Sequence, residues 1–270
     1  MKTTLASARK LADLSPVARA QVDWWIGKLG ADTPLDDIQP RDVRRHLQAE
    51  THLSGSTKNR YASALSAVFR AAQEEMVWDG VNPTRLIVKW PEGAPRQRAL
   101  SRVEIEQLLV ACRASTWPKL YLLVLLAITT GMRRGNLENL RHCDFNGNRI
   151  GPVLTKNGSQ FIGVLTPEAA AELARFLEPG STQLMFEGQP GKPFLFNNAL
   201  DKAFKAAGLT DVIFHTFRHT AASMAATGGA STLQIMDLLN HKTPAMAARY
   251  SHLNVTAREK LVDAVFAGVR

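Results

Sequence analysis

Apolar residues recur at helical spacing along most of the chain, and the first ninety residues show only this pattern. Three helices are expected there, beginning at Ser15–Pro16, at Pro40 and at Ser56 or Thr57. Proline costs no hydrogen bond in the first turn of a helix, so Pro16 and Pro40 mark favourable starts. We therefore predict a helical domain over residues 1–90.

A short segment rich in proline, glycine and arginine follows this region. Residues 91–99 read Pro-Glu-Gly-Ala-Pro-Arg-Gln-Arg-Ala, a composition typical of an interdomain linker. A second domain is then expected over residues 100–270.

The second domain is also mainly helical in pattern. Ser101 and Glu104 are spaced as a capping box that opens a helix through Leu109, and an apolar run indicates a buried helix over about 117–129. Asn157–Gly158 lies between two apolar segments, as the turn of a β-hairpin does. Further helices are expected over 167–177, 198–207, 216–227, 231–239, 244–249 and 257–267. The expected fold class is mainly α with a small β-hairpin or sheet.

Composition narrows the class of partner. Of the 270 residues 45% are hydrophobic, enough for one large core or two smaller ones. Lysine and arginine number 33 against 24 acidic residues, and the resulting net charge of +9 indicates a polyanionic partner. Cys112 and Cys143 lie far apart, so we expect no disulfide framework and a reducing cytoplasm. No apolar run is long enough for a membrane span, and no membrane partner is expected.

The C-terminal third holds side chains suited to chemistry on a phosphate. Tyr250 follows a group of histidines and arginines in the sequence. Because an ordinary tyrosine hydroxyl has a pKa of about 10, it is a weak nucleophile at neutral pH. It needs a base, or cations that stabilise the phosphoryl oxygens it attacks. The neighbouring basic side chains supply candidates for both.

Five motifs occur in one order along this region: Thr130-Gly131-Met132-Arg133, Lys156 in the hairpin turn, His215-x-x-Arg218-His219, Leu239-x-His241 and Arg249-Tyr250. Together they resemble the tyrosine recombinases, also called phage integrases. Residues 101–270 resemble the catalytic domain of that family, and residues 12–90 resemble its helical core-binding domain. The resemblance implies a two-domain clamp, shaped like a C, on duplex DNA.

The resemblance also implies a role for each motif residue. Tyr250 would attack the scissile phosphate, form a 3′-phosphotyrosyl link and release a 5′-hydroxyl. Arg133 and Arg218 would clamp the non-bridging oxygens, a task suited to planar guanidinium groups. His241 would donate a further hydrogen bond to the same oxygens.

Two steps of proton transfer remain in this scheme. Lys156 would protonate the leaving 5′-oxygen, and His215 would serve as the base or orient the nucleophile. His219 is expected to be structural. Although His215 and His219 are spaced as zinc ligands on a helix, no nearby glutamate or cysteine completes such a site. We therefore expect no metal and no cofactor.

Two positions depart from the pattern of the family. Asn136 stands where a glutamate is common, which removes a carboxylate that could brace Arg133. Asn240 replaces a glycine, and asparagine is the next-best residue for a left-handed helix cap. Separately, Gly188–Pro193 imitates a P-loop but lacks its spacing and its final serine or threonine.

The implied function is site-specific recombination of the integrase type, by four protomers on double-stranded DNA through a Holliday junction. We expect a cytoplasmic, nucleoid-associated protein, with an accessory directionality factor as a candidate partner. Little chain precedes the first expected helix, so a simple recombinase without an arm-binding domain is expected. The alternatives are a Xer-type dimer resolvase, a type IB topoisomerase, or a DNA-binding architectural protein that has lost activity.

The last expected helix is amphipathic. Thr256 and Glu259 form a capping box, and apolar residues follow at positions 261, 262, 265, 266 and 269. An apolar stripe on a terminal helix must be covered by its own domain or by a neighbour. The resemblance implies that it packs on the adjacent protomer during synapsis, and that it packs on its own domain, or is disordered, in the free monomer. Packing on its own domain throughout is the alternative.

Overall fold

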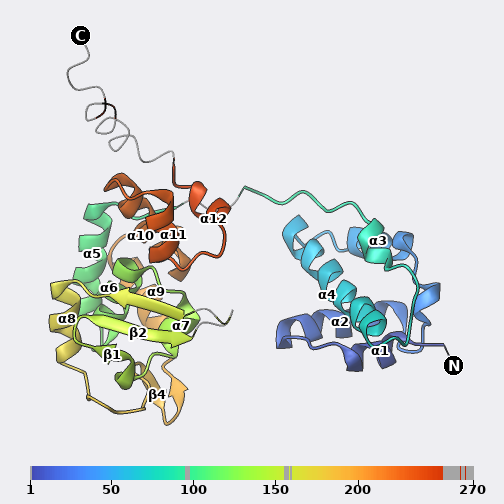
Figure 1. The fold of residues 1–270 in the computed structure, drawn as a ribbon, viewed down its shortest axis with the longest axis horizontal. Coiled ribbons are helices and arrows are strands. Elements are labelled where there is room, and N and C mark those ends of the chain that lie inside the picture. The colour runs from blue at the N-terminus through green and yellow to red at the C-terminus, as the bar shows by residue number, and fades with distance from the viewer. Residues whose placement is uncertain are drawn as a thin grey trace. The chain divides into compact units, whose positions relative to one another are not determined.

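The computed structural model describes residues 2–94, 98–154, 158, 160–251, 262 and 265. The chain divides into two compact units, Met1–Pro95 and Arg96–Arg270, and each is described by itself (Figure 1). The division falls inside residues 91–99, the segment expected to be a linker. Helices dominate the described residues and two small sheets accompany them, which confirms the expected fold class.

The N-terminal unit is helical throughout its described residues. Its elements are α1 Leu5–Leu11, α2 Pro16–Leu29, the 3-10 helix η1 Leu35–Asp37, α3 Pro40–Ala49, α4 Gly55–Glu74 and the 3-10 helix η2 Pro83–Leu86. The three expected helices are confirmed as α2, α3 and α4. α4 begins slightly earlier than expected because the hydroxyl of Ser54 accepts a hydrogen bond from the Thr57 amide at 3.3 Å. α1 has no counterpart among the expected helices, because seven residues are too few to show a period.

The core of this unit forms where α2 and α4 pack together. Trp25 and Phe69 are fully buried, and the indole N–H of Trp25 donates to the Tyr61 carbonyl at 2.9 Å. Asn59 on α4 binds the backbone of Trp90 twice, because Nδ2 donates to its carbonyl at 3.0 Å and Oδ1 accepts from its amide at 2.9 Å. The chain therefore stays attached to α4 up to the segment expected to be a linker.

The C-terminal unit combines helices with the two small sheets. Its described elements are α5 Arg102–Arg113, α6 Leu120–Thr130, α7 Arg134–Glu138, the 3-10 helix η3 His142–Asp144, β1 Phe145–Asn146, β2 Arg149–Leu154, β3 Gln160–Val164, α8 Pro167–Ala174, β4 Glu187–Gln189, β5 Lys192–Pro193, α9 Asn197–Ala206, α10 Phe214–Thr227, α11 Thr232–Leu238 and α12 Pro244–Ala248.

Most sequence-based expectations for this unit are confirmed. The expected helices correspond to α5, α6, α8, α9, α10, α11 and α12, with ends that differ by a few residues. The capping box of Ser101 and Glu104 is present at the start of α5. The expected helix over 257–267 lies outside the described residues except for Val262 and Val265, which are helical.

The expected β-hairpin is confirmed within a three-stranded antiparallel sheet of order β1-β2-β3. β2 pairs with β3, and Ile150 lies opposite Gly163. Residues 155–157 and 159 at the hairpin tip lie outside the described residues, and Lys156 is among them.

β4 and β5 form a separate two-stranded antiparallel hairpin. The glycine-rich stretch Gly188–Pro193 lies in this hairpin, so it does not lead directly into a helix as a phosphate-binding loop does. Across the described residues, none of the helices combines the length and the apolar character that a membrane crossing requires.

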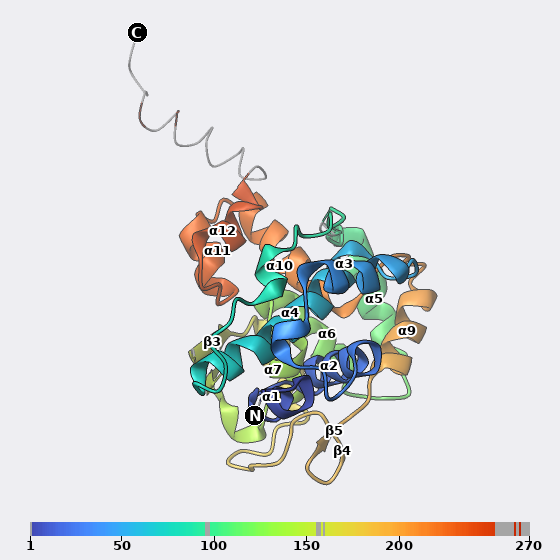
Figure 2. The ribbon, with the colours of Figure 1, turned by 90° about the vertical axis from the view of Figure 1, so that its right-hand side faces the viewer.

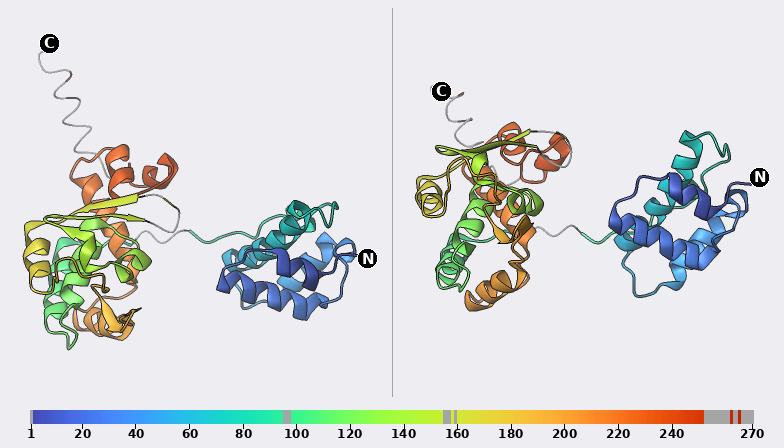
Figure 3. Two further views of the ribbon diagram at one scale, coloured as in Figure 1. Left: turned by 60° about the horizontal axis from the view of Figure 1, so that its bottom comes forward. Right: turned by 90° about the horizontal axis from the view of Figure 1, so that it is seen from below.

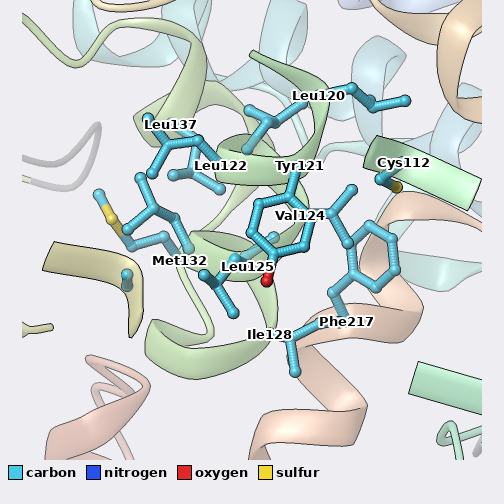
Figure 4. Close-up of a cluster of buried hydrophobic side chains, with 14 of the residues drawn as sticks. Cys112, Leu120, Tyr121, Leu122, Val124, Leu125, Ile128, Met132, Leu137 and Phe217 are labelled. Atoms are coloured by element: carbon cyan, nitrogen blue, oxygen red, sulfur yellow. The ribbon is translucent and has the colours of Figure 1, made fainter. Parts of the chain in front are cut away.

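α6 is the centre of the C-terminal core (Figure 4). Every residue from Leu120 to Ile128 is buried. A helix that is apolar on all sides must be covered on all sides, and α5, α8 and α10 pack against it. Phe217 of α10 belongs to the same cluster. Packing on α6 thus fixes α10, which carries His215 and Arg218.

Candidate active site

α10 presents three of the motif residues on neighbouring turns. His215, Arg218 and His219 are three and four positions apart, so they lie along one side of the helix. The helix begins at Phe214 because the Ile213 amide donates to the hydroxyl of Thr216 at 3.1 Å. Figure 2 shows α10 beside α11 and α12, which precede Tyr250.

Arg218 is held between the ends of two helices. Its side chain is buried, with 5% of the residue exposed. Nη1 donates to the carbonyl of Gly131 at 2.8 Å and Nη2 donates to the carbonyl of Leu239. These residues cap the C-termini of α6 and α11, where the carbonyls carry partial negative charge. Burial, followed by the charge of Arg133, lowers the pKa of Arg218 to about 10, so it remains cationic at neutral pH.

The loop after α6 brings Arg133 to the same place. Gly131 has a left-handed φ of +61°, and a Cβ there would lie 2.4 Å from Cδ2 of Leu239. Only glycine fits this close approach, which presses the loop onto the end of α11. Arg133 is half-buried and occupies the N-cap position of α7.

His241 lies in the turn after α11. Asn240 adopts a left-handed φ of +48°, which confirms the expected cap, and the amide of His241 donates to the Met236 carbonyl at 2.8 Å. His241 is 9% exposed, and its buried Nδ1 has no hydrogen-bond partner in the described part of the chain. Burial and the charges of three arginines, Arg218 first, lower its pKa to about 4. The imidazole is therefore neutral at neutral pH.

Tyr250 follows α12 and is 7% exposed. Its ring packs in a small apolar cluster with Ala226, Ile235 and Leu239. Its hydroxyl lies 2.6 Å from Nδ1 of His219. Burial raises the pKa of Tyr250, and the positive charges of Arg249 and Arg218 offset part of that rise.

His215 packs edge-on against His219, with ring centroids 4.8 Å apart. Desolvation, followed by the charges of Arg218 and Arg133, lowers the pKa of His215. His215 is therefore neutral at neutral pH, as a base must be. It has no recorded hydrogen bond with Tyr250 among the residues that the structure describes, so its role as base stays a prediction.

Five of the six residues singled out from the sequence gather in one region. They lie close enough together that the charges of some of them change the pKa values of others. They are Arg133, His215, Arg218, His241 and Tyr250. The sixth, Lys156, lies outside the described residues, but the hairpin that carries it is tied to this region. Nδ2 of Asn240 donates to the carbonyl of Gln160 on β3 at 3.2 Å. Figure 3 shows the ribbon of the three-stranded sheet beside the C-terminal helices.

Sequence reasoning gave no chemical role to two residues that the structure places here. His219 contacts the hydroxyl of Tyr250, although it was expected to be structural. Arg249 lowers the pKa of all three histidines and of Tyr250. The only sequence signal for either was adjacency, since Arg249 precedes Tyr250 and His219 follows Arg218.

The arrangement suits an oxyanion and a nucleophile in one place. Arginine side chains provide fixed cations, and the guanidinium of Arg218 is held in place by the carbonyls at two helix ends. Donors that are fixed before the reaction need no reorganisation as charge develops, so they stabilise a phosphoryl transition state efficiently. Tyr250 supplies a hydroxyl for covalent attack.

The Phage integrase family model matches residues 98–257, and the chain belongs to this family. The chain is 30% identical over 252 residues to the prophage phiRv2 integrase of Mycobacterium tuberculosis. The aligned region covers 82% of this chain and 65% of that protein. It is 26% identical over 232 residues to the integrase of Salmonella phage P22. This aligned region covers 78% of this chain and 58% of that protein. The matches thus span less than two thirds of these relatives.

Solved structures share the fold. A lambda integrase tetramer bound to a Holliday junction aligns with a TM-score of 0.72 and 20% identity, over 94% of this chain and 79% of that chain. The Tn1549 transposon integrase in complex with transposon right end DNA aligns with a TM-score of 0.72 and 16% identity, over 97% of this chain and 99% of that chain.

Proposed function

We propose that this chain is a site-specific DNA recombinase of the integrase type. One observation carries the proposal: Tyr250 lies in the same region as the buried guanidinium of Arg218, which two carbonyls hold in a fixed orientation. A buried cation beside a tyrosine hydroxyl is an arrangement that stabilises phosphoryl transfer to that hydroxyl.

In the proposed reaction the oxygen of Tyr250 attacks the scissile phosphorus. A bond from phosphorus to the tyrosine oxygen forms, the hydroxyl proton of Tyr250 passes to a histidine of the site, the bond to the 5′-oxygen breaks, and Lys156 protonates the leaving oxygen. Arg133, Arg218 and His241 stabilise the charge that develops on the non-bridging oxygens. The phosphotyrosine conserves the energy of the broken bond, so rejoining needs no nucleotide and no cofactor.

The proposed partner is double-stranded DNA, and both the N-terminal and the C-terminal unit would contribute contacts to it. The net charge of +9 favours this partner. By analogy with the lambda integrase tetramer on a Holliday junction, four protomers would exchange strands between two sites. An accessory directionality factor and association with the nucleoid belong to the same proposal.

A second function, Xer-type dimer resolution, would use the same chemistry. The tyrosine recombinase XerA of Saccharolobus solfataricus is 27% identical over 165 residues, and these cover 58% of this chain and 52% of that protein. An integrase joins a mobile element to a host site, whereas a resolvase separates two copies of one site. A plasmid carrying two direct copies of the cleaved site, assayed beside a pair of unlike sites, distinguishes these outcomes.

The first test is covalent capture on DNA. Nicked duplexes tiled across the DNA that flanks the gene are incubated with the protein in EDTA, and the products are separated in detergent. We expect one duplex to give a covalent protein–DNA band without added metal. Tyr250→Phe should bind this duplex with unchanged affinity and give no band, because groove and phosphate contacts belong to other residues. A band with Tyr250→Phe would place the nucleophile elsewhere, and binding without any band in the wild type would indicate an architectural protein.

A further inference from the structure

We propose that His219, rather than His215, takes the proton from Tyr250 when the tyrosine attacks DNA. The inference rests on the proposed function and assigns a catalytic role within the same site. It follows from the contact between Nδ1 of His219 and the hydroxyl oxygen of Tyr250, which are 2.6 Å apart.

Geometry selects His219 among the candidate bases. A general base must lie within hydrogen-bond reach of the proton that it removes, about 2.6–3.2 Å between heavy atoms. Nδ1 of His219 meets this condition. Of the side chains that the structure describes, no other has a recorded hydrogen bond with the Tyr250 hydroxyl, and His215 instead packs its ring on His219. His215 therefore contacts the proposed base through its ring and has no recorded contact with the nucleophile.

The direction of the hydrogen bond follows from the charges around it. His215 and Arg218 on α10, and Arg249 after α12, face His219, and with desolvation as the leading cause they lower its pKa. His219 is therefore neutral and can accept at Nδ1 while it keeps its proton on Nε2. The hydroxyl of Tyr250 is then the donor. Since burial also raises the pKa of Tyr250, the proton stays on the tyrosine until DNA binds.

Two of the cations near His219 also act on the tyrosine. Arg249 and Arg218 lower the pKa of Tyr250, so they stabilise negative charge on its oxygen. The same cations would repel the imidazolium that forms when His219 takes the proton. The scissile phosphate brings negative charge into this region and offsets that repulsion. Proton transfer to His219 is thereby coupled to the presence of DNA.

The step balances as follows. The O–H bond of Tyr250 breaks, an N–H bond forms at Nδ1 of His219, and the tyrosine oxygen bonds to phosphorus. The bond from phosphorus to the 5′-oxygen breaks, and that oxygen takes a proton from Lys156. In the rejoining step the imidazolium of His219 returns its proton to the departing tyrosine oxygen.

The test compares two substitutions at one position. His219→Asn places an amide oxygen near the position of Nδ1, so it can accept a hydrogen bond but cannot carry the proton. His219→Ala removes both properties. Single-turnover rates of covalent adduct formation are measured from about pH 4.5 to about pH 10 on the captured nicked duplex, alongside DNA affinity and thermal unfolding.

We expect both variants to bind DNA as the wild type does and to cleave about 100-fold more slowly at neutral pH, since general bases typically contribute 10²- to 10⁴-fold. Their rates should rise with pH as the tyrosine ionises without help. Added imidazole should restore part of the rate of His219→Ala. In His215→Asn the cleavage rate should still increase with pH in the low-pH range, as it does in the wild type. This increase reports the loss of a proton from His219.

Three results would overturn the inference. A wild-type rate in His219→Asn would mean that a hydrogen bond is sufficient and that no proton is transferred to this residue. A wild-type rate in His219→Ala would remove the residue from the reaction. If the increase of the rate with pH in the low-pH range disappeared in His215→Asn alone, His215 and not His219 would be the base. Each result presupposes a wild-type covalent adduct, so its absence would refute the proposed function instead.

Discussion

α6 and α10 pack against each other in the C-terminal unit, and they bury different kinds of side chain. α6 is apolar on every side. α10 buries Thr216, Arg218 and Thr220 beside Phe217 and small apolar residues, and each of these polar groups is hydrogen bonded. Burying a cation costs free energy that only paired groups offset. The comparison teaches that the two helices contribute differently. The packing of α6 stabilises the unit, and it offsets the free-energy cost of burying the polar groups of α10, which orients the reactive side chains.

The largest expected effect tests the α10 side of this comparison. Arg218→Lys keeps a positive charge but cannot reach the carbonyls of Gly131 and Leu239 together. We expect cleavage of the captured duplex to slow by about 10³-fold, as when one fixed donor is removed from an oxyanion site. Arg218→Met should lose at least as much and should also destabilise the unit, because two carbonyls at helix ends lose their partner.

DNA affinity measured beside the cleavage rate serves as the control for Arg218. In the proposed complex many phosphate contacts would come from residues other than Arg218, so both variants should bind duplex DNA within a few-fold of wild type. A near-normal cleavage rate in Arg218→Lys would show that charge alone is sufficient and that the planar fork has no role.

The second prediction tests the α6 side. Leu122 is fully buried at the centre of the core, and Leu122→Ala should lower the free energy of unfolding by about 2–5 kcal/mol. Its cleavage rate per folded molecule should remain that of the wild type at low temperature. Val110→Ala, on α5 at 71% exposure, is the matched control and should change stability by less than about 0.5 kcal/mol. Calorimetry of the full chain resolves the affected transition.

The third prediction concerns pH. The pKa of His241 is about 4 in the folded unit and about 6.5 in an unfolded chain, so the unfolded chain binds more protons between these values. Stability should therefore fall as pH decreases from 6.5 to 4, by about 2 kcal/mol. The lowered pKa values of His215 and His219 act in the same direction. His241→Gln should flatten this dependence, and His52→Gln, at an exposed position, should not.

The same comparison shows what sequence can predict. The spacing of apolar residues and the capping residues predicted α6 and most other helices, because these signals are local in the sequence. The start of α10 was placed two residues late, since Ile213 offers no capping side chain of its own and the contact comes from Thr216. The order of the motifs indicated which residues would gather. It did not indicate that His219 meets Tyr250, 31 positions away, because that contact depends on how α10 and α12 pack.

The smallest effect is expected at Asn240, which links the turn of His241 to the hairpin. Its φ of +48° suits glycine better than asparagine, but its amide donates to Gln160 on β3. In Asn240→Gly the relief of backbone strain and the loss of this exposed hydrogen bond oppose each other, so stability should change by less than about 1 kcal/mol. Asn240→Ala has neither advantage and should be less stable than Asn240→Gly by about 1 kcal/mol. If the two variants were equally stable, the left-handed backbone would not be the constraint at this turn. If Asn240→Gly also cleaved DNA at the wild-type rate, the bond to β3 would contribute nothing to placing the hairpin, and the reactive groups would depend on α10 alone.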